Sequence, residues 1–203
     1  YNQRHSKATT ILALIPAYNE AERITAVITG TRALLPVLVV DDGSTDDTAA
    51  ISSALGAEVL RQLPNQGKGA ALLAGFRYAL EMGYQAVVTL DADGQHDPQE
   101  IPLFIHAFEE GADLVIGMRD FKKMPFPRNI SNTIGTWLFS WALGQYCPDN
   151  QSGYRLHSRR MIETSLQSAE TNFEFEVEII TRCVEQGYLL RWVPIKTIYA
   201  GEK

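Results

Sequence analysis

Cysteine and histidine are scarce in this sequence, and they form no recognisable ligand pattern. The 203 residues include two cysteines, Cys147 and Cys183, which lie far apart and outside any CxxC pair. The four histidines are scattered, and only His96 stands beside a pair of aspartates. These absences exclude a disulfide framework and give no support to a zinc module. They favour a reducing, cytoplasmic setting.

Long apolar runs and an excess of positive charge are missing as well. No uninterrupted apolar run approaches the ~20 residues that span a bilayer, and residues 1–10 lack the apolar core of a signal peptide. The formal net charge of −6 gives no support to nucleic-acid binding. Because the chain begins with Tyr1, we expect it to be a trimmed piece of a longer product. We expect this piece to be cytoplasmic and, at most, attached to the cytoplasmic face of a membrane.

Strand and helix patterns alternate as far as Arg119. Strands are expected at 11–16, 37–40, 58–62, 86–90 and 113–118. Helices are expected at 20–35, 45–55, 67–82 and 98–110. Such alternation is typical of right-handed βαβ units, so the prediction is an α/β fold with a mainly parallel central sheet and helices on both faces.

Beyond Arg119 the alternation stops. The pattern there predicts a basic and aromatic loop at 120–129, an apolar helix at 130–146, a strand at 153–156, helices at 158–168 and 173–186, and an extended segment at 189–199. No linker or internal repeat interrupts the chain. The length therefore favours a single domain over residues 1–203.

Two aspartates follow the fourth expected strand. Asp91 and Asp93 are one residue apart, and Gln95 follows two positions later, at the sheet edge where open α/β folds place their ligands. Oxygen ligands of this kind suit Mg²⁺ or Mn²⁺, which commonly bridges to the phosphates of a substrate. A solvated turn is the alternative, since Asp, Gly and Gln are ordinary loop residues.

Polar residues also follow the first two expected strands. Tyr18 can stack on a base and Glu20 can accept hydrogen bonds from a base or ribose, although a helix cap at Asn19 explains this loop equally well. Asp41 and Asp42 close the second strand, within a segment that holds four aspartates in seven positions. A capped turn requires fewer acidic residues, so this segment favours recognition of a base or ribose.

Two further segments have the residue types expected of an anion-binding site. Lys68, between two glycines at an expected helix start, stands where backbone N–H groups attract a phosphate, although a lone GKG is weak evidence. The segment 149–155 follows a basic set, Arg119, Lys122, Lys123 and Arg128. Arginine suits bidentate phosphate contacts, so we interpret Arg119 and Arg155 as anion ligands and the two lysines as solvated loop residues.

The order of these motifs resembles the family 2 glycosyltransferases with the GT-A fold. The resemblance is closest to the polyprenyl-phosphate sugar synthases, a group that includes the dolichol-phosphate mannose synthases. The matching segments are IPAYNE, VVDDGSTDDT, NQGKGAALLAGF, TLDADGQHDP, the GMR at 117–119 and the DNQSGYRL at 149–156. The resemblance implies a Rossmann-like GT-A sheet, a nucleotide-sugar donor, Mg²⁺ or Mn²⁺, and inversion at the anomeric carbon.

The resemblance also implies a role for each matching position. The nucleotide is expected to be bound by Pro16, Ala17, Tyr18, Glu20, Asp41, Asp42, Lys68, Asp91 and Ala92. The metal ion is expected on Asp91, Asp93 and Gln95. The acceptor is expected beside Arg119, Arg128, Ser131, Ser152 and Arg155, with Asp93 and Arg119 as the catalytic residues. About residues 8–120 would then bind nucleotide and metal, and about 121–203 the acceptor.

The acidic residues of the second half bear on the acceptor. A hydroxyl acceptor normally needs a general base, whereas a phosphate is already anionic and needs a cationic cradle. Glu174 and Glu176 are not adjacent, and Gln186 stands too far from Arg191 and Trp192 for the QxxRW signature of processive synthases, with four intervening residues in place of two. We therefore predict transfer of a hexose, from a GDP-mannose or UDP-glucose type of donor, to a polyprenyl or dolichyl phosphate. Transfer to a hydroxyl with Glu174 or Glu176 as base is the alternative.

The sequence gives less support to two other functions. A nucleotidyltransferase would carry a glycine-rich, basic loop after the first strand, and residues 16–20 contain none. A non-catalytic nucleotide-sugar binding module is disfavoured by the aspartates together with the Arg119 and Arg128 pair.

The expected helix at 130–146 has Trp137 and Trp141 on one face. This face could contact the membrane interface, or the helix could be buried against the sheet. The sequence leaves the oligomeric state open.

Overall fold

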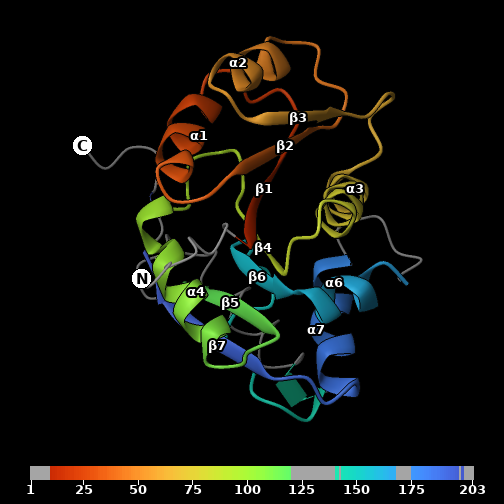
Figure 1. The fold of residues 1–203 in the computed structure, drawn as a ribbon. Helices are drawn as coiled ribbons and strands as arrows, with labels where there is room; N and C mark the ends of the chain where they lie inside the picture. The colour runs from red at the N-terminus through yellow and green to blue at the C-terminus, as the bar shows by residue number, and fades with distance from the viewer. Residues whose placement is uncertain (1–9, 120–139, 142, 168–174, 197, 199–203) are drawn as a thin grey trace, which may run out of the picture.

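The computed structural model describes residues 10–119, 140–141, 143–167, 175–196 and 198, and a single sheet forms its centre (Figure 1). The seven strands lie in the order β3-β2-β1-β4-β6-β5-β7. Their bounds are β1 Ile11–Ala17, β2 Val37–Asp41, β3 Glu58–Arg61, β4 Ala86–Thr89, β5 Leu114–Arg119, β6 Arg155–Ser158 and β7 Leu190–Ile195. Only β6 runs antiparallel to its neighbours among these strands. The predicted mainly parallel sheet is confirmed.

Helices cover both faces of this sheet, as predicted (Figure 1). One face carries α1 (Ile24–Arg32), α2 (Thr48–Ala54) and α4 (Ile101–Glu109), which continues the short 3-10 helix η1 (Pro98–Glu100). The other face carries α3 (Lys68–Glu81), α6 (Arg159–Ser165) and α7 (Phe175–Glu185). All seven residues of β1 are buried, with Ala13 and Ile15 facing one helix layer and Leu12 and Leu14 the other. Burial on both sides is typical of central strands in parallel sheets.

The start of α2 differs from the prediction. The sequence favours a helix from residue 45, whereas α2 begins at Thr48. Before that point, aspartate side chains accept hydrogen bonds from backbone N–H groups. Asp41 Oδ1 accepts from the Ser44 N–H at 3.1 Å, and Asp46 Oδ1 accepts from the Thr48 N–H at 3.0 Å. Because these side-chain bonds compete with a helical turn, residues 44–47 form a loop.

The strand predicted at 153–156 is also displaced. It is β6, which begins at Arg155, so Gly153 belongs to the preceding loop. The Thr89 hydroxyl of β4 donates to the Gly153 carbonyl at 2.8 Å and fixes this loop over the end of the sheet. The helix predicted at 130–146 lies mostly outside the described residues. No helix in the described part of the chain is long and apolar enough to cross a membrane.

Candidate active site

A cavity of about 320 Å³ opens at the carboxyl ends of β1, β2 and β4, beside the start of α3. Its lining residues come from four sequence-distant segments: Pro16, Ala17, Tyr18, Glu20, Asp42, Asn65, Gly67, Lys68, Ala71, Asp91, Ala92 and Asp93. The structure thus brings together almost every residue that was predicted to contact a nucleotide. This edge of the sheet is where α/β folds bind their ligands.

The loop after β1 is held against the loop after β2 through Asn19. The Asn19 N–H donates to Ser44 Oγ at 2.9 Å, and its own Oδ1 accepts from the Thr45 N–H at 2.9 Å. Asn19 has a positive φ of 54°, a conformation that asparagine adopts more readily than most residues. This arrangement leaves the ring of Tyr18 half exposed at the cavity, where it can stack on a base.

Glu20 provides an acceptor at the same cavity. Its Oε2 atom is buried and makes no hydrogen bond within the described residues, although Arg23 Nε lies 3.5 Å away. Burial raises the pKa of Glu20, and the Arg23 guanidinium opposes this shift only in part. A buried oxygen without a hydrogen-bond donor is costly, so the geometry suits a ligand N–H or hydroxyl.

Asp42 anchors the start of α3. Its two carboxylate oxygens accept from the N–H groups of Gln66 at 2.8 Å and Gly67 at 2.7 Å, and Asn65 Nδ2 donates to its carbonyl at 2.9 Å. Gly67 has a φ of 93°, which disfavours any residue with a side chain at this turn. Asp42 therefore determines where the positive end of α3, and with it Lys68, meets the cavity.

Asp41 has a different role from the one predicted. Its side chain is fully buried, accepts from Arg61 Nε at 2.7 Å and from the Ser44 N–H, and does not line the cavity. The structure therefore gives Asp41 a role in supporting the loop, in place of the predicted contact with the nucleotide.

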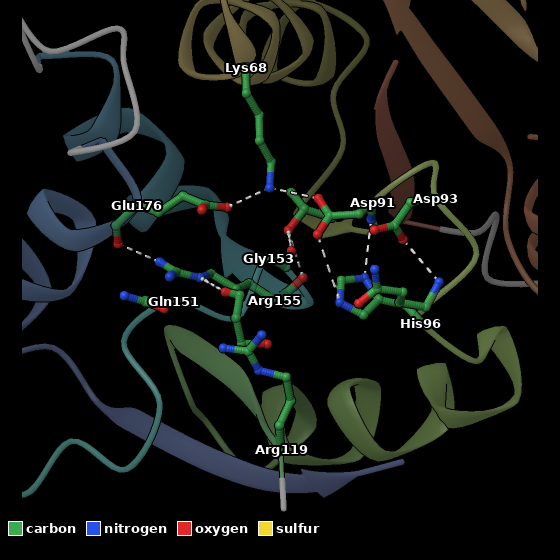
Figure 2. Close-up of polar contacts among 12 residues, drawn as sticks. Lys68, Asp91, Asp93, His96, Arg119, Gln151, Gly153, Arg155 and Glu176 are labelled. Atoms are coloured by element: carbon green, nitrogen blue, oxygen red, sulfur yellow. Dashed lines mark hydrogen bonds and ion pairs between the residues drawn. The ribbon is translucent and has the colours of Figure 1, made fainter. Parts of the chain in front are cut away.

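Lys68 forms a bridge between two carboxylates (Figure 2). Its Nζ atom lies 2.6 Å from Asp91 Oδ1 and 3.1 Å from Glu176 Oε1. Burial alone would lower the pKa of Lys68, but the charges of Asp91 and Glu176 outweigh it and raise the pKa above its ordinary value. Burial alone would likewise raise the pKa of Asp91, and Lys68 lowers it instead. Lys68 and Asp91 are therefore both charged at neutral pH.

His96 supports Asp91 from the other side. The Asp91 N–H donates to His96 Nδ1 at 3.1 Å, and the imidazole stacks on Tyr154 with the ring centres 4.9 Å apart. Tyr154 in turn stacks on Phe104 of α4 at 4.3 Å. Burial lowers the pKa of His96, which favours the neutral ring that this hydrogen bond requires. His96 was predicted only to lie near the aspartates, and the structure makes it a support for them.

The predicted metal ligands divide into two groups. The carboxylates of Asp91 and Asp93 line the same cavity, whereas Gln95 is exposed and its N–H donates to Asp93 Oδ1 at 2.9 Å. No cluster of three or more His, Cys, Asp or Glu side chains suited to a metal ion occurs in the described part of the chain. Two carboxylates on one cavity fit Mg²⁺ or Mn²⁺ that completes its coordination with water and substrate phosphates.

Arg119 ends β5 in a bidentate ion pair with Asp149. Its Nε and Nη2 atoms donate to the two carboxylate oxygens at 2.7 and 2.8 Å, and Asp149 is fully buried. The Asp149 partner was not predicted. A paired arginine at the end of a strand is rigidly placed, so Arg119 remains a candidate for contact with an acceptor phosphate.

Arg155 and Ser152 are buried, which differs from their predicted contact with the acceptor. The Arg155 guanidinium is 1% exposed and donates to the carbonyls of Ser152 at 2.7 Å, Glu176 at 2.5 Å and Asn150 at 3.1 Å. Ser152 is also 1% exposed. Arg155 thus joins the 149–153 loop to α7 and has a structural role. Arg128, Ser131 and Glu174 lie outside the described residues.

Gly153 lies directly beside the ion pair of Lys68 and Asp91. A Cβ atom at this position would lie 2.7 Å from Asp91 Oδ2 and 2.8 Å from Lys68 Nζ. Only glycine lets the loop come this close without displacing the pair. The position was predicted as part of a strand, and its closeness to Asp91 was not predicted.

The sheet and its site define a GT-A type of glycosyltransferase, with a nucleotide-sized cavity and two aspartates at the carboxyl edge of the sheet. The chain belongs to glycosyl transferase family 2, whose profile matches residues 13–167. The resemblance, the fold class and the enzyme class predicted from the motifs are thereby confirmed, and the protein is a glycosyltransferase.

Several relatives share most of their length with this chain. Polyprenol monophosphomannose synthase of Mycolicibacterium smegmatis is 32% identical, with 91% of this chain and 76% of the relative covered. Undecaprenyl-phosphate mannosyltransferase of Micrococcus luteus is 34% identical, covering 91% and 82%. UDP-N-acetylglucosamine–dolichyl-phosphate N-acetylglucosaminyltransferase of Methanococcus voltae is 31% identical, covering 93% and 86%.

A solved structure supports the fold. Glucosyl-3-phosphoglycerate synthase of Mycobacterium tuberculosis, in complex with Mn²⁺, UDP and glucosyl-3-phosphoglycerate, superimposes with a TM-score of 0.77. The sequences are 22% identical, and the match covers 97% of this chain and 74% of that one. At this identity the likeness establishes the architecture, and it does not assign the substrates.

Proposed function

We propose that the protein transfers a hexose from a nucleotide sugar to a polyprenyl or dolichyl phosphate, with inversion at the anomeric carbon. The observation that carries this proposal is the cavity in which Asp91 and Asp93 face the positive end of α3, within reach of the Lys68 ammonium. Three relatives named for sugar transfer to polyprenyl phosphates or polyprenols support the choice of acceptor.

The donor would occupy the described cavity in a defined orientation. Tyr18 would stack on the base, Glu20 would accept from the nucleoside, and Lys68 would lie beside the diphosphate. Asp91 and Asp93 would bind Mg²⁺ or Mn²⁺, which supplies Lewis-acid stabilisation of the diphosphate leaving group when bound. Relatives named for mannosyl transfer favour a GDP-mannose type of donor, with a UDP-glucose type as the alternative.

The ion pair between Glu176 and Lys68 favours a phosphate acceptor over a hydroxyl acceptor. Glu176 is buried and bonded to Lys68, so its carboxylate is not free to take a proton from an incoming hydroxyl. A phosphate oxygen needs no base, because it is already anionic. Arg119, paired with Asp149 at the end of β5, would supply positive charge for that phosphate together with Arg128.

An acceptor with a polyprenyl tail places the enzyme at a membrane surface. We propose peripheral attachment at the cytoplasmic face. Trp141 and Tyr146 are 78% and 77% exposed, and they follow the basic loop in the chain. Exposed aromatic rings of this kind are suited to the membrane interface.

The experiment that tests this function is release of nucleoside diphosphate in the presence of Mn²⁺. GDP-mannose, UDP-glucose and UDP-N-acetylglucosamine would each be tried with and without a short polyprenyl phosphate. We expect release that depends on one donor and on the lipid phosphate. Lipid-independent release that requires an added glycan would instead favour the hydroxyl acceptor. Binding of a donor without any release would favour the non-catalytic module.

A further inference from the structure

The Lys68 ammonium and a divalent metal ion would compete for the same carboxylate, that of Asp91. The ammonium lies 2.6 Å from Asp91 Oδ1, and that carboxylate is also one of the two proposed to bind a divalent ion. An ammonium and a metal ion repel each other at such distances, because both are cations in a partly buried site. Asp91 cannot therefore serve both with equal strength.

Glu176 offers Lys68 a second partner. Its Oε1 atom lies 3.1 Å from Lys68 Nζ, on the side of the ammonium away from Asp91 (Figure 2). Glu176 is 7% exposed, and its backbone carbonyl accepts from Arg155 at 2.5 Å, so the backbone that carries this carboxylate is held at the start of α7. A buried carboxylate requires a cation, which keeps Lys68 within reach if it leaves Asp91.

We propose that Lys68 acts as an internal cation that holds Asp91 before the divalent ion binds, and that Glu176 is a positioning residue which retains Lys68 when the ion takes its place. The proposal rests on the metal binding assigned above. It gives Glu176 a role other than that of a base. It also links the nucleotide side of the cavity to α7, which belongs to the part of the chain expected to bind the acceptor.

The loop at Gly153 fits this role. Any side chain there would meet both members of the Lys68–Asp91 pair within 3 Å, and the Gly153 carbonyl is fixed by Thr89. The backbone of the loop thus lies directly against the ion pair. The movement that we propose for Lys68 is therefore toward Glu176, whose Oε1 atom is 3.1 Å away, and not toward the loop.

The test is the affinity for Mn²⁺ in the absence of nucleotide, measured from the electron paramagnetic resonance signal of free Mn²⁺. Wild type, Lys68→Met, Glu176→Gln and the double variant form a cycle. Lys68→Met should tighten Mn²⁺ binding about tenfold, which corresponds to about 1.4 kcal/mol. Glu176→Gln should weaken it about threefold or more, because Lys68 then has Asp91 as its main partner.

The cycle of variants distinguishes a Glu176 that acts through Lys68 from a Glu176 that contributes only its negative charge. If Glu176 acts through Lys68, Glu176→Gln should change the affinity much less in the Lys68→Met background. Equal changes in both backgrounds would mean that Glu176 contributes only its charge, and would overturn its proposed role. Should Lys68→Met alone fail to fold, because it leaves Glu176 unpaired, comparison of Glu176→Gln with the double variant still measures the competition.

Two controls complete the design. Arg77→Met removes one positive charge from an exposed position of the same helix, about 13 Å along the axis at 1.5 Å per residue, and should leave the Mn²⁺ affinity unchanged. Asp93→Asn tests the metal assignment itself. Binding that Asp93→Asn does not weaken would overturn that assignment. Binding that Asp93→Asn weakens but Lys68→Met fails to strengthen would overturn the present proposal alone.

Discussion

At the scale of single residues, the site depends on how each carboxylate is already occupied. Asp91 is held by Lys68 through its side chain and by His96 through its N–H, whereas Asp93 accepts a hydrogen bond only from the Gln95 N–H within the described part of the chain. Asp93 thus faces the cavity with more of its acceptor capacity available. A metal ion would therefore depend most directly on Asp93.

This difference predicts a large loss of activity in Asp93→Ala. We expect kcat/KM to fall about 10²–10³-fold, because charge stabilisation of the leaving diphosphate is lost. Lys122→Ala, a change in the basic loop outside the described residues, should leave most activity. The measurement is initial-rate release of nucleoside diphosphate at several Mn²⁺ concentrations. Near-wild-type turnover of Asp93→Ala would refute the metal assignment.

A second prediction concerns Gly153. Gly153→Ala should lower kcat/KM about tenfold or more, since its Cβ would displace Lys68 or Asp91 and small displacements near reacting groups are costly. Steady-state kinetics, compared with the midpoint of thermal unfolding, separate this effect from a loss of fold. Unchanged kinetics in a normally folded Gly153→Ala variant would show that the ion pair tolerates displacement.

Single residues also show how far sequence reasoning reaches. Asp42 and Asp91 could be predicted because they follow buried strands of a parallel sheet, whose carboxyl ends meet at one edge. Asp41 could not be separated from Asp42, since adjacent residues at a strand end point in opposite directions and only the exact register decides. The contact of Glu176 with Lys68 joins α7 to α3, so it depends on tertiary packing that no local pattern records.

At the scale of elements, Asp113 joins three parts of the sheet and its helices. Its carboxylate accepts from the Leu189 N–H before β7 at 2.9 Å and from Ser158 Oγ before α6 at 3.0 Å, and it forms a bidentate pair with Arg160. Asp113 itself precedes β5 and is 3% exposed. This one carboxylate therefore fixes the amino end of β5 relative to β7 and α6.

Removal of that carboxylate should destabilise the fold. Asp113→Ala would leave the Leu189 N–H and the Ser158 hydroxyl without this acceptor, and we expect a loss of about 2–3 kcal/mol in the free energy of unfolding. Glu163→Ala removes an exposed ion pair with Arg159 and should cost less than about 1 kcal/mol. Urea unfolding monitored by circular dichroism measures both. Equal, small effects would contradict this role of Asp113.

The same carboxylate predicts a dependence of stability on pH. Burial alone would raise the pKa of Asp113, but hydrogen bonds from Arg160, Leu189 and Ser158 lower it. The folded state therefore binds this proton more weakly than the unfolded chain, where the carboxyl pKa is ~3.9. The stability that Asp113 contributes is present above about that value and is lost as the pH falls through its lower native pKa. Asp113→Ala should remove this part of the acid dependence.

The strands also show which features a local sequence pattern can predict and which depend on tertiary structure. The alternating patterns predicted the parallel strands β1 to β5 in the correct chain order, because each is apolar and bounded by turn residues. They did not predict that β6 runs antiparallel between β4 and β5, since a short apolar strand carries no signal for its direction. That insertion carries Gly153, just before β6, to the side of Asp91, so this missed contact follows from a missed feature of the topology.

At the scale of the whole molecule, the proposed reaction separates donor recognition from acceptor recognition. The donor cavity is built at β1, β2, β4 and α3, whereas Arg119 lies at the end of β5 with its partner Asp149. Arg119→Gln should therefore leave the dissociation constant of the nucleotide sugar nearly unchanged while it raises KM for polyprenyl phosphate about tenfold or more. Equal losses for donor and acceptor would contradict this separation.

The charge of the acceptor gives the proposed reaction a characteristic pH profile. The second pKa of a phosphate monoester is about 6, so the lipid phosphate is a dianion above that pH and loses one charge below it. Because no protein base is required, kcat/KM for polyprenyl phosphate should fall tenfold per pH unit below about 6 and stay level above it. Glu176→Gln should keep this profile and mainly raise the Mn²⁺ concentration needed for half-maximal rate. A profile whose acid limb disappears in Glu176→Gln would identify Glu176 as the base and favour a hydroxyl acceptor.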